Sequence, residues 1–311
     1  MRIGLIDVDG HNFPNLALMR ISAYHKMKGD TVEWWWSDLI HYDIVYMSKI
    51  FSDAYSKDIA EPRNCDCVIK GGTGYCISLD ASGKEVFDKE RNTSLPIEIE
   101  NMFPDYSIYP QYDFAISMTS RGCPRGCSFC HVVAKEGRCA RKEADVSDFW
   151  AGQKEIKVLD PNITAVKEKD KRDLMRQYKE TCALIDFTQG LDIRLLNDAD
   201  ISDINEMRIK TLHFAWDNPR ENLEPKFKAF AEQFRRKSNI GMVYCLTNFN
   251  STMKENLYRI YTLRDMGYDP YVMIYDKPHA PKEIRDLQRW CNNKIIFKSC
   301  AKFEDYKGGA K

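Results

Sequence analysis

Apolar and polar residues alternate between strand-like and helix-like spacings over the first hundred residues. An apolar, β-branched run at residues 2–8 predicts a strand, and the helical spacing of apolar residues over 15–28 predicts a helix that ends at Gly29. Further strands are predicted at residues 31–36, 43–48 and 67–70. Strand–helix–strand alternation of this kind predicts a small, Rossmann-like parallel sheet.

A second alternating series begins at residue 109. Its strand-like runs lie at residues 114–118, 156–159, 184–187, 211–215, 240–245 and 271–275. Helical patterns separate them and include residues 167–182, 225–237 and 254–266. Six βα units of this length predict a partial barrel of parallel strands, of the (β/α)6 kind.

The pattern thus predicts an α/β chain in three parts. Residues 1–108 form the Rossmann-like domain, and their polar, proline-containing end at 78–108 is expected to connect it to the next domain. Residues 109–285 form the partial barrel. Residues 286–311 are expected to be a C-terminal extension that packs on the barrel.

Composition and charge limit the class of protein, its partners and its cellular compartment. The chain has 311 residues, of which 43% are hydrophobic and 30% charged, which is typical of a globular protein. Basic and acidic residues balance at 46 each, which argues against nucleic acid or an anionic membrane as a general partner, although a locally basic groove stays compatible. The odd count of 11 cysteines at irregular spacings favours a reducing compartment. Without a signal peptide or a membrane-length segment, we expect a cytoplasmic protein.

The motif with the clearest chemistry is a cysteine trio. Cys123, Cys127 and Cys130 have C-x3-C-x2-C spacing in a loop that follows a predicted strand. Cysteine thiolates are the usual ligands of iron–sulfur clusters, and three ligands on a four-iron cluster leave one iron open for chemistry. The alternative is a structural zinc site that adds Cys139 or His131. Zinc sites usually use two cysteine pairs separated by a longer spacer, so the single trio favours a cluster.

The same motif, with the aromatic Phe129 directly before the last cysteine, resembles the signature of the radical S-adenosylmethionine (SAM) superfamily. The resemblance implies a [4Fe-4S] cluster on the three cysteines and SAM at its open iron. It also implies reductive cleavage of SAM to a 5′-deoxyadenosyl radical that abstracts a substrate hydrogen. A reductant such as flavodoxin or ferredoxin would then be a partner.

Candidate SAM-binding residues follow from a geometric rule, because reacting groups of α/β barrels lie at the carboxyl ends of strands. The carboxylate of SAM needs cationic or amide donors, so Gln189 and Arg194 are assigned to its methionyl end. Its ribose diol needs a carboxylate, so Asp192 or Asp217 is assigned there. The resemblance places Phe129 against the adenine. Each of these polar residues could instead be an ordinary loop residue or a strand-end cap.

The N-terminal part resembles the cobalamin-binding domain of one radical SAM subclass, including a glycine pair at Gly71 and Gly72. The cobalamin pattern Asp-x-His-x-x-Gly is absent, so we expect a degenerate domain that shapes the substrate cleft without cobalamin. His11 and Asn12, in the loop after the first strand, are its candidate catalytic residues because open parallel sheets bind ligands at that edge.

Residues 6–15 (Ile-Asp-Val-Asp-Gly-His-Asn-Phe-Pro-Asn) and 47–51 (Met-Ser-Lys-Ile-Phe) resemble a bacterial radical SAM group that includes queuine lyase. That resemblance implies a small-molecule substrate, a 7-deazaguanine base, and radical cleavage of a C–N bond. Two alternatives stay open. One is another radical SAM modification enzyme, cobalamin-linked or of the methylthio type, acting on RNA, peptide or a small molecule. The other is a zinc-stabilised α/β binding protein.

Overall fold

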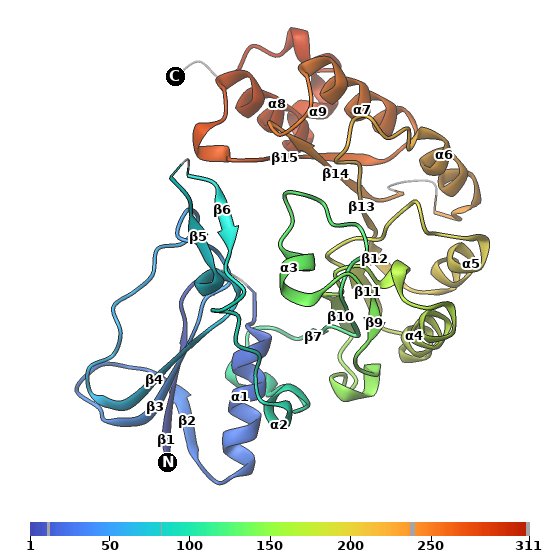
Figure 1. The fold of residues 1–311 in the computed structure, drawn as a ribbon. Coiled ribbons are helices and arrows are strands. Elements are labelled where there is room, and N and C mark those ends of the chain that lie inside the picture. Colours follow the sequence, from blue (N-terminus) through green and yellow to red (C-terminus); the bar gives the residue numbers. More distant parts are fainter. Residues whose placement is uncertain (11–12, 82, 237–239, 309–311) are drawn as a thin grey trace. The chain divides into compact units, whose positions relative to one another are not determined.

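A computed structural model describes residues 1–10, 13–81, 83–236 and 240–308 and shows an α/β protein with parallel sheets (Figure 1). The predicted α/β class is therefore confirmed. The chain divides into two compact units: unit 1 is Met1–Ser117, Gly122–Cys139 and Ala144–Gln153, and unit 2 is Met118–Arg121, Ala140–Glu143 and Lys154–Lys311. The predicted domain boundaries stay predictions. Across the described ranges, no helix combines the length and apolar character that crossing a membrane requires.

Unit 1 contains a four-stranded parallel sheet in the order β2-β1-β3-β4. Its strands are β1 (Arg2–Asp7), β2 (Thr31–Trp34), β3 (Tyr42–Ser48) and β4 (Cys65–Gly71). Helix α1 (Leu16–Met27) follows β1 and begins at Asn15, whose side chain accepts a hydrogen bond from the Leu18 amide. Ile3, Leu5 and Ile21 pack with Leu18 in the core, which is why the apolar periodicity predicted these elements correctly.

The predicted connection at residues 78–108 contains structure of its own. Strands β5 (Ile77–Leu79) and β6 (Glu85–Phe87) form an antiparallel hairpin, and α2 (Ile97–Glu100) follows. Three-residue strands are too short to show a period of two, so the sequence pattern missed them. The remaining elements of unit 1 are β7 (Ala115–Ser117) and α3 (Val132–Glu136).

Unit 2 alternates parallel strands with helices. Its strands are β8 (Ser120–Arg121), β9 (Arg141–Lys142), β10 (Glu155–Val158), β11 (Leu184–Phe187), β12 (Ile209–Thr211), β13 (His213–Ala215), β14 (Met242–Thr247) and β15 (Asp269–Ile274). Its helices are α4 (Glu168–Thr181), α5 (Asp198–Glu206), α6 (Glu224–Gln233), α7 (Met253–Asp265), α8 (Lys282–Asn292) and α9 (Lys294–Ser299). Strands β8 and β9 pair antiparallel.

The long strands of unit 2 belong to two sheets, one with β10, β11 and β12 and one with β13, β14 and β15, and within each sheet they are adjacent in chain order. Strand β11 pairs in parallel with β10 and β12, and β14 pairs in parallel with β13 and β15. The strand predicted at residues 211–215 is correct in position but is interrupted at Leu212, which separates β12 from β13. Leu212 is fully buried, so the interruption lies inside the core.

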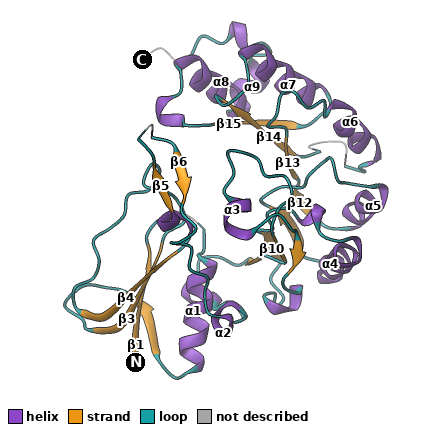
Figure 2. Cartoon of the chain, viewed as in Figure 1, coloured by secondary structure: helices purple, strands orange, loops and turns teal. Residues whose placement is uncertain are grey.

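Helices α4 to α8 lie along one side of these strands (Figure 2). The aromatic side chain of Phe187 on β11 meets Tyr178 of α4, and Phe214 on β13 meets Phe230 of α6. On β15, Val272 packs in one cluster with Trp290 of α8. The apolar residues of alternate positions therefore face the helices, and their neighbours face the other side of the sheet.

A buried arginine holds the carboxyl ends of β13 and β14 in place. The Arg259 guanidinium, from α7, is fully buried and donates hydrogen bonds to the carbonyl oxygens of Trp216 and Asp217 and, at 2.9 Å, of Leu246. It also donates to Asn256 at 2.7 Å. The planar, forked donors of arginine suit several acceptors at once, so this one residue orders two strand-end loops.

Replacing Arg259 tests that role. Arg259→Met is expected to lower the free energy of unfolding by about 3 kcal/mol or more, because several buried carbonyls lose their donor. Arg259→Lys is expected to be intermediate, since an ammonium cannot reach all of these acceptors. Chemical denaturation measures both. Lys254→Met, at an exposed position of the same helix, is the control and is expected to cost less than about 0.5 kcal/mol. Equal stability of the Arg259 and Lys254 variants would contradict this role.

Candidate functional site

The cysteine loop lies within unit 1 and is held at both of its ends. The Gly122 amide donates to Glu136 at 3.1 Å, and the Cys123 amide donates to the Gly137 carbonyl at 3.2 Å. Within the loop, the Cys130 amide donates to the Cys127 carbonyl at 3.0 Å. These hydrogen bonds join Glu136 and Gly137, after the loop, to Gly122 and Cys123 at its start. The segment that carries the three cysteines is therefore closed at its base.

The loop turns at Gly126, where the backbone has a φ of 61°. A Cβ atom added there would lie 2.6 Å from the Arg138 guanidinium, so glycine meets both a conformational and a steric requirement. Cys127 and Cys130 are exposed and Cys123 is half-buried. Three soft thiolate donors on one accessible loop form a donor set that suits an iron–sulfur cluster.

Two side chains after the cysteines are bound by other parts of unit 1. His131 Nε2 lies 3.3 Å from a Glu85 carboxylate oxygen, and its ring stacks on Phe87 at 6.0 Å between centroids. On α3, Lys135 Nζ donates to the Thr73 hydroxyl at 2.7 Å. The β5–β6 hairpin, which the sequence pattern missed, therefore positions the residue next to Cys130.

The carboxyl edge of the unit 1 sheet is the second part of the candidate site. The strand order reverses between β1 and β3, and open parallel sheets bind ligands at such a switch point. Asp9, after β1, is buried and accepts hydrogen bonds from the amides of Ile50 and Phe51, after β3, at 2.9 and 2.7 Å. This carboxylate ties the two loops together. His11 and Asn12, the predicted catalytic residues, lie outside the described residues.

The glycines after β4 are explained by close backbone packing. Gly72 has a φ of 101°, and an added Cβ would lie 2.3 Å from the Lys49 carbonyl oxygen. At Gly74 an added Cβ would lie 2.2 Å from the Phe51 carbonyl oxygen. The loop after β4 therefore rests directly on the loop after β3, which accounts for Gly72 and Gly74, whereas a Cβ at Gly71 would meet open space.

In unit 2 a buried carboxylate fixes the segment that precedes the cysteine loop in the sequence. Asp160, after β10, accepts hydrogen bonds from the Thr119 amide at 2.7 Å, the Thr119 hydroxyl at 2.8 Å and the Ser120 hydroxyl at 2.6 Å. Removal from water raises the pKa of Asp160 to about 6, and these hydrogen bonds oppose the rise.

Unit 2 contains several of the predicted SAM-binding residues, and two of them, Asp192 and Arg194, are in contact. Arg194 Nε donates to Asp192 at 2.6 Å, and an Arg194 terminal nitrogen donates to Glu221 at 2.5 Å. Asp217 accepts a hydrogen bond from the Leu246 amide at 3.1 Å, and burial raises the pKa of Asp217 to about 6. Glu221 was missed because it lies six residues beyond the end of β13, outside the strand-end rule.

Gln189 and Phe129 are the other two predicted SAM-binding residues. Gln189 is exposed in the loop after β11, and Phe129 is half-buried on the cysteine loop, in the other unit. Arg194 already has two carboxylate partners, so a SAM carboxylate at Arg194 would have to compete with Asp192 and Glu221. The carboxylates of this cluster suit amino or hydroxyl groups better.

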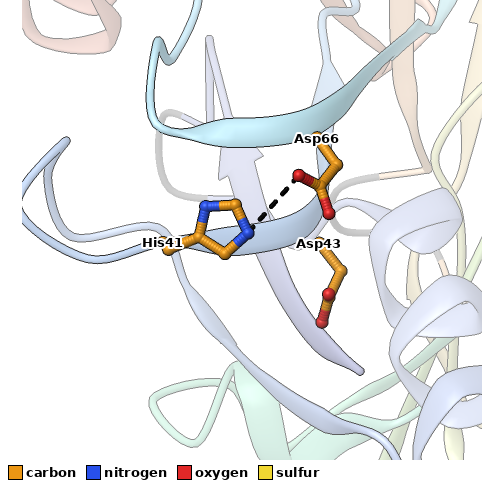
Figure 3. A group of neighbouring side chains, drawn as sticks. All are labelled: His41, Asp43 and Asp66. Carbon is orange, nitrogen blue, oxygen red and sulfur yellow. Dashed lines mark ion pairs between the residues drawn. The ribbon is translucent and has the colours of Figure 1, made fainter.

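A separate group with metal-ligand chemistry lies at the amino ends of β3 and β4 (Figure 3). His41, Asp43 and Asp66 each have a ligand atom within 4.8 Å of the others, and His41 Nε2 is 3.5 Å from Asp66. His41 also contacts Asn64 at 3.2 Å, and Asp43 accepts a hydrogen bond from the Arg2 amide. We interpret the group as a surface ion-pair cluster, because its members are engaged and mostly exposed.

Comparison of the chain with models of known families and with curated proteins finds no match. The interpretation of the site therefore rests on its residues, their contacts and the motif they form. The cysteine loop offers thiolates, and the carboxyl edges of the sheets offer carboxylates and backbone groups.

The pKa of Asp160 gives a testable pH dependence. Its folded-state pKa of about 6 exceeds the value of 3.8 for an unperturbed carboxyl, so the folded state binds the proton more tightly. The free energy of unfolding is therefore expected to fall as pH rises from about 4 to about 6, by about 3 kcal/mol from this group. Asp160→Asn should remove this contribution and leave the part of the slope that comes from Asp217, whose pKa is also raised to about 6; denaturation at several pH values measures the difference.

The control for this experiment is Asp173→Asn. A hydrogen bond from Lys142 and further bonds from Arg176 lower the pKa of Asp173 to about 2, so its own pH dependence lies below this window. The Asp173 variant should keep the wild-type slope. A wild-type slope that persists in Asp160→Asn would show that another group causes it.

Proposed function

We propose that the chain is a radical SAM enzyme whose Cys123, Cys127 and Cys130 hold a [4Fe-4S] cluster. The observation that carries the proposal is the C-x3-C-x2-C trio on one accessible loop, which is closed by hydrogen bonds at both ends. A loop of this form supplies three thiolates without a fourth cysteine in the motif, which leaves a coordination position for SAM.

The architecture of unit 2 supports the proposal. Parallel strands that are adjacent in chain order, each followed by a helix on the same side, are what a partial (β/α)6 barrel requires. A doubly wound sheet would instead reverse its order, as the sheet of unit 1 does. The barrel interpretation assigns β10 to β15 to five strands of its wall, with β12 and β13 as the two halves of one strand, and the predicted strand at residues 114–118 to the sixth.

The chain's own residues have defined tasks in this mechanism. A cluster with SAM bound supplies reductive cleavage of SAM to methionine and the 5′-deoxyadenosyl radical. Asp192 and Asp217 offer carboxylate acceptors for the amino or ribose hydroxyl groups of SAM, and Arg194 holds Asp192 in orientation. Gln189 stays the candidate amide donor to the methionyl end, and Phe129 the aromatic surface for the adenine.

The specific reaction that the motifs favour is that of queuine lyase. In it, a hydrogen atom would be taken from the cyclopentenediol of queuine, and the amine would leave with the C–N bonding electrons and a proton as 7-aminomethyl-7-deazaguanine. The carbon radical that remains on the ring would take one electron from the proposed reductant and one proton. The two segments that carry the resemblance, residues 6–15 and 47–51, contain Asp9 and the amides of Ile50 and Phe51 that it binds. The resemblance therefore coincides with the switch point of the unit 1 sheet, an edge at which open parallel sheets bind ligands.

Anaerobic reconstitution with iron and sulfide tests the cluster. The wild-type protein should bind close to four iron and four sulfide per chain and cleave SAM when reduced, because three thiolates hold a four-iron cluster. Cys127→Ala should lose both properties. Cys67→Ser, at an exposed cysteine on β4 outside the motif, is the matched control and should keep them.

The zinc alternative gives a different result in the same experiment. A chain that takes up one zinc ion, releases it when Cys139 or His131 is replaced, and never cleaves SAM would be a zinc-stabilised binding protein. That outcome would remove the enzyme proposal.

Incubation of the reduced, SAM-cleaving protein with queuine tests the specific reaction. We expect 7-aminomethyl-7-deazaguanine in an amount that rises with 5′-deoxyadenosine, measured by liquid chromatography and mass spectrometry. Cys127→Ala is the control and should form neither product. SAM cleavage without release of the base would remove the lyase assignment and leave the radical SAM assignment in place.

A further inference from the structure

A row of polar side chains lies on the faces of the two parallel sheets of unit 2 that the helices do not cover. It comprises Lys157 on β10, Asp186 on β11, His213 on β13, Tyr244 on β14 and Tyr271 on β15. Lys157 and Asp186 are direct cross-strand partners in the parallel register of β10 and β11. The immediate chain neighbours of these residues are buried apolar residues that face the helices, so alternation places the row on the opposite face.

Asp186 is the unusual member of the row. It is only 7% exposed, yet its Oδ1 atom has no hydrogen-bond partner among the described residues. Its nearest partners are His213 Nε2, 3.2 Å from Oδ1 without hydrogen-bond geometry, and Lys157 Nζ, 3.8 Å from Oδ2. A buried carboxylate oxygen without a hydrogen bond is costly and calls for an explanation, and a ligand that supplies the missing donor is one.

The neighbours of Asp186 restrict what such a ligand can be. On one side the Lys157 ammonium can only donate hydrogen bonds. On the other side the His213 and Tyr244 rings are stacked, with centroids 5.6 Å apart and planes at 16°, and the Tyr244 hydroxyl contacts His213 Nδ1 at 3.0 Å. Tyr271 meets Tyr244 edge to face at 5.9 Å. The site thus offers a donor, a pair of acceptor oxygens and aromatic surface, in that order across the strands.

We propose that Asp186 and Lys157 recognise the 2-amino-4-oxo edge of a guanine-like base. In that edge a ring N–H and an exocyclic amino group are parallel donors, which match the two oxygens of a carboxylate. The adjacent carbonyl oxygen matches the Lys157 ammonium, and the flat ring matches the aromatic pair. The inference rests on the proposed function for the substrate class and adds the residues that select it.

Binding of two matched bases tests the inference without any turnover. 7-Deazaguanine carries the complete edge, and 7-deazahypoxanthine lacks only the 2-amino group. Isothermal titration calorimetry under anaerobic conditions should show tighter binding of 7-deazaguanine to the wild-type protein. Asp186→Asn should weaken 7-deazaguanine binding about 10- to 100-fold, because the asparagine NH2 group replaces one acceptor oxygen and faces a donor of the base. The preference between the two bases should be abolished.

Two further variants complete the design. Lys157→Met should weaken both bases, since both carry the carbonyl, and it tests the site independently if Asp186→Asn fails to fold. Asp203→Asn, on α5, is the control for a carboxylate-to-amide change and should bind as the wild type does. Melting curves of all variants establish that they are folded.

The outcomes separate this inference from the proposed function. Wild-type affinity for 7-deazaguanine in Asp186→Asn, or equal wild-type affinity for the two bases, would overturn the inference. SAM cleavage in the absence of a base reports on the proposed enzyme, whereas the affinity and the preference for the two bases report on Asp186 and Lys157. Absence of SAM cleavage from the wild type would remove the proposed enzyme and leave the binding result to decide on the base site.

Discussion

In each of the two units, a buried carboxylate near the carboxyl ends of the parallel strands accepts hydrogen bonds from a neighbouring chain segment and fixes the position of that segment. Asp160 does so in unit 2, where its oxygens receive an amide and two hydroxyl groups from Thr119 and Ser120. Asp9 does so in unit 1, with two backbone amides. For Asp160, desolvation outweighs the hydrogen bonds and raises the pKa to about 6. The positions of the chain segments around both carboxylates thus depend on hydrogen bonds to a few oxygen atoms.

The sequence predicted most of the long elements because burial and period agree in them. The helix after β1 and strand β11 match their predictions closely, since their apolar residues Leu18, Ile185 and Phe187 are buried in a core. The β5–β6 hairpin was missed because its strands are three residues long and half exposed. The interruption at Leu212 was missed because Leu212 is apolar like its neighbours, so the pattern of apolar residues does not distinguish it from a strand residue.

The parts of the candidate site that depend on one residue type, the cysteines and the glycines, could be predicted from the sequence. The spacing of the cysteines is visible in the sequence, and so are the glycines whose close approach to the loop after β3 the structure explains. Partnerships between distant residues are not visible. Nothing in the sequence couples Arg194 to Glu221, or leaves Asp186 without a donor while Asp160 has three, because these depend on side-chain placement across strands.

The path of the chain around the cysteine loop has a consequence for how this protein can be divided. Residues 118–121 and 140–143 belong to unit 2, whereas the loop between them belongs to unit 1. Neither unit is therefore encoded by one uninterrupted stretch of the gene. Transferring the N-terminal sheet as one continuous segment would leave the cysteine loop behind, so an exchange of unit 1 requires all three of its chain segments.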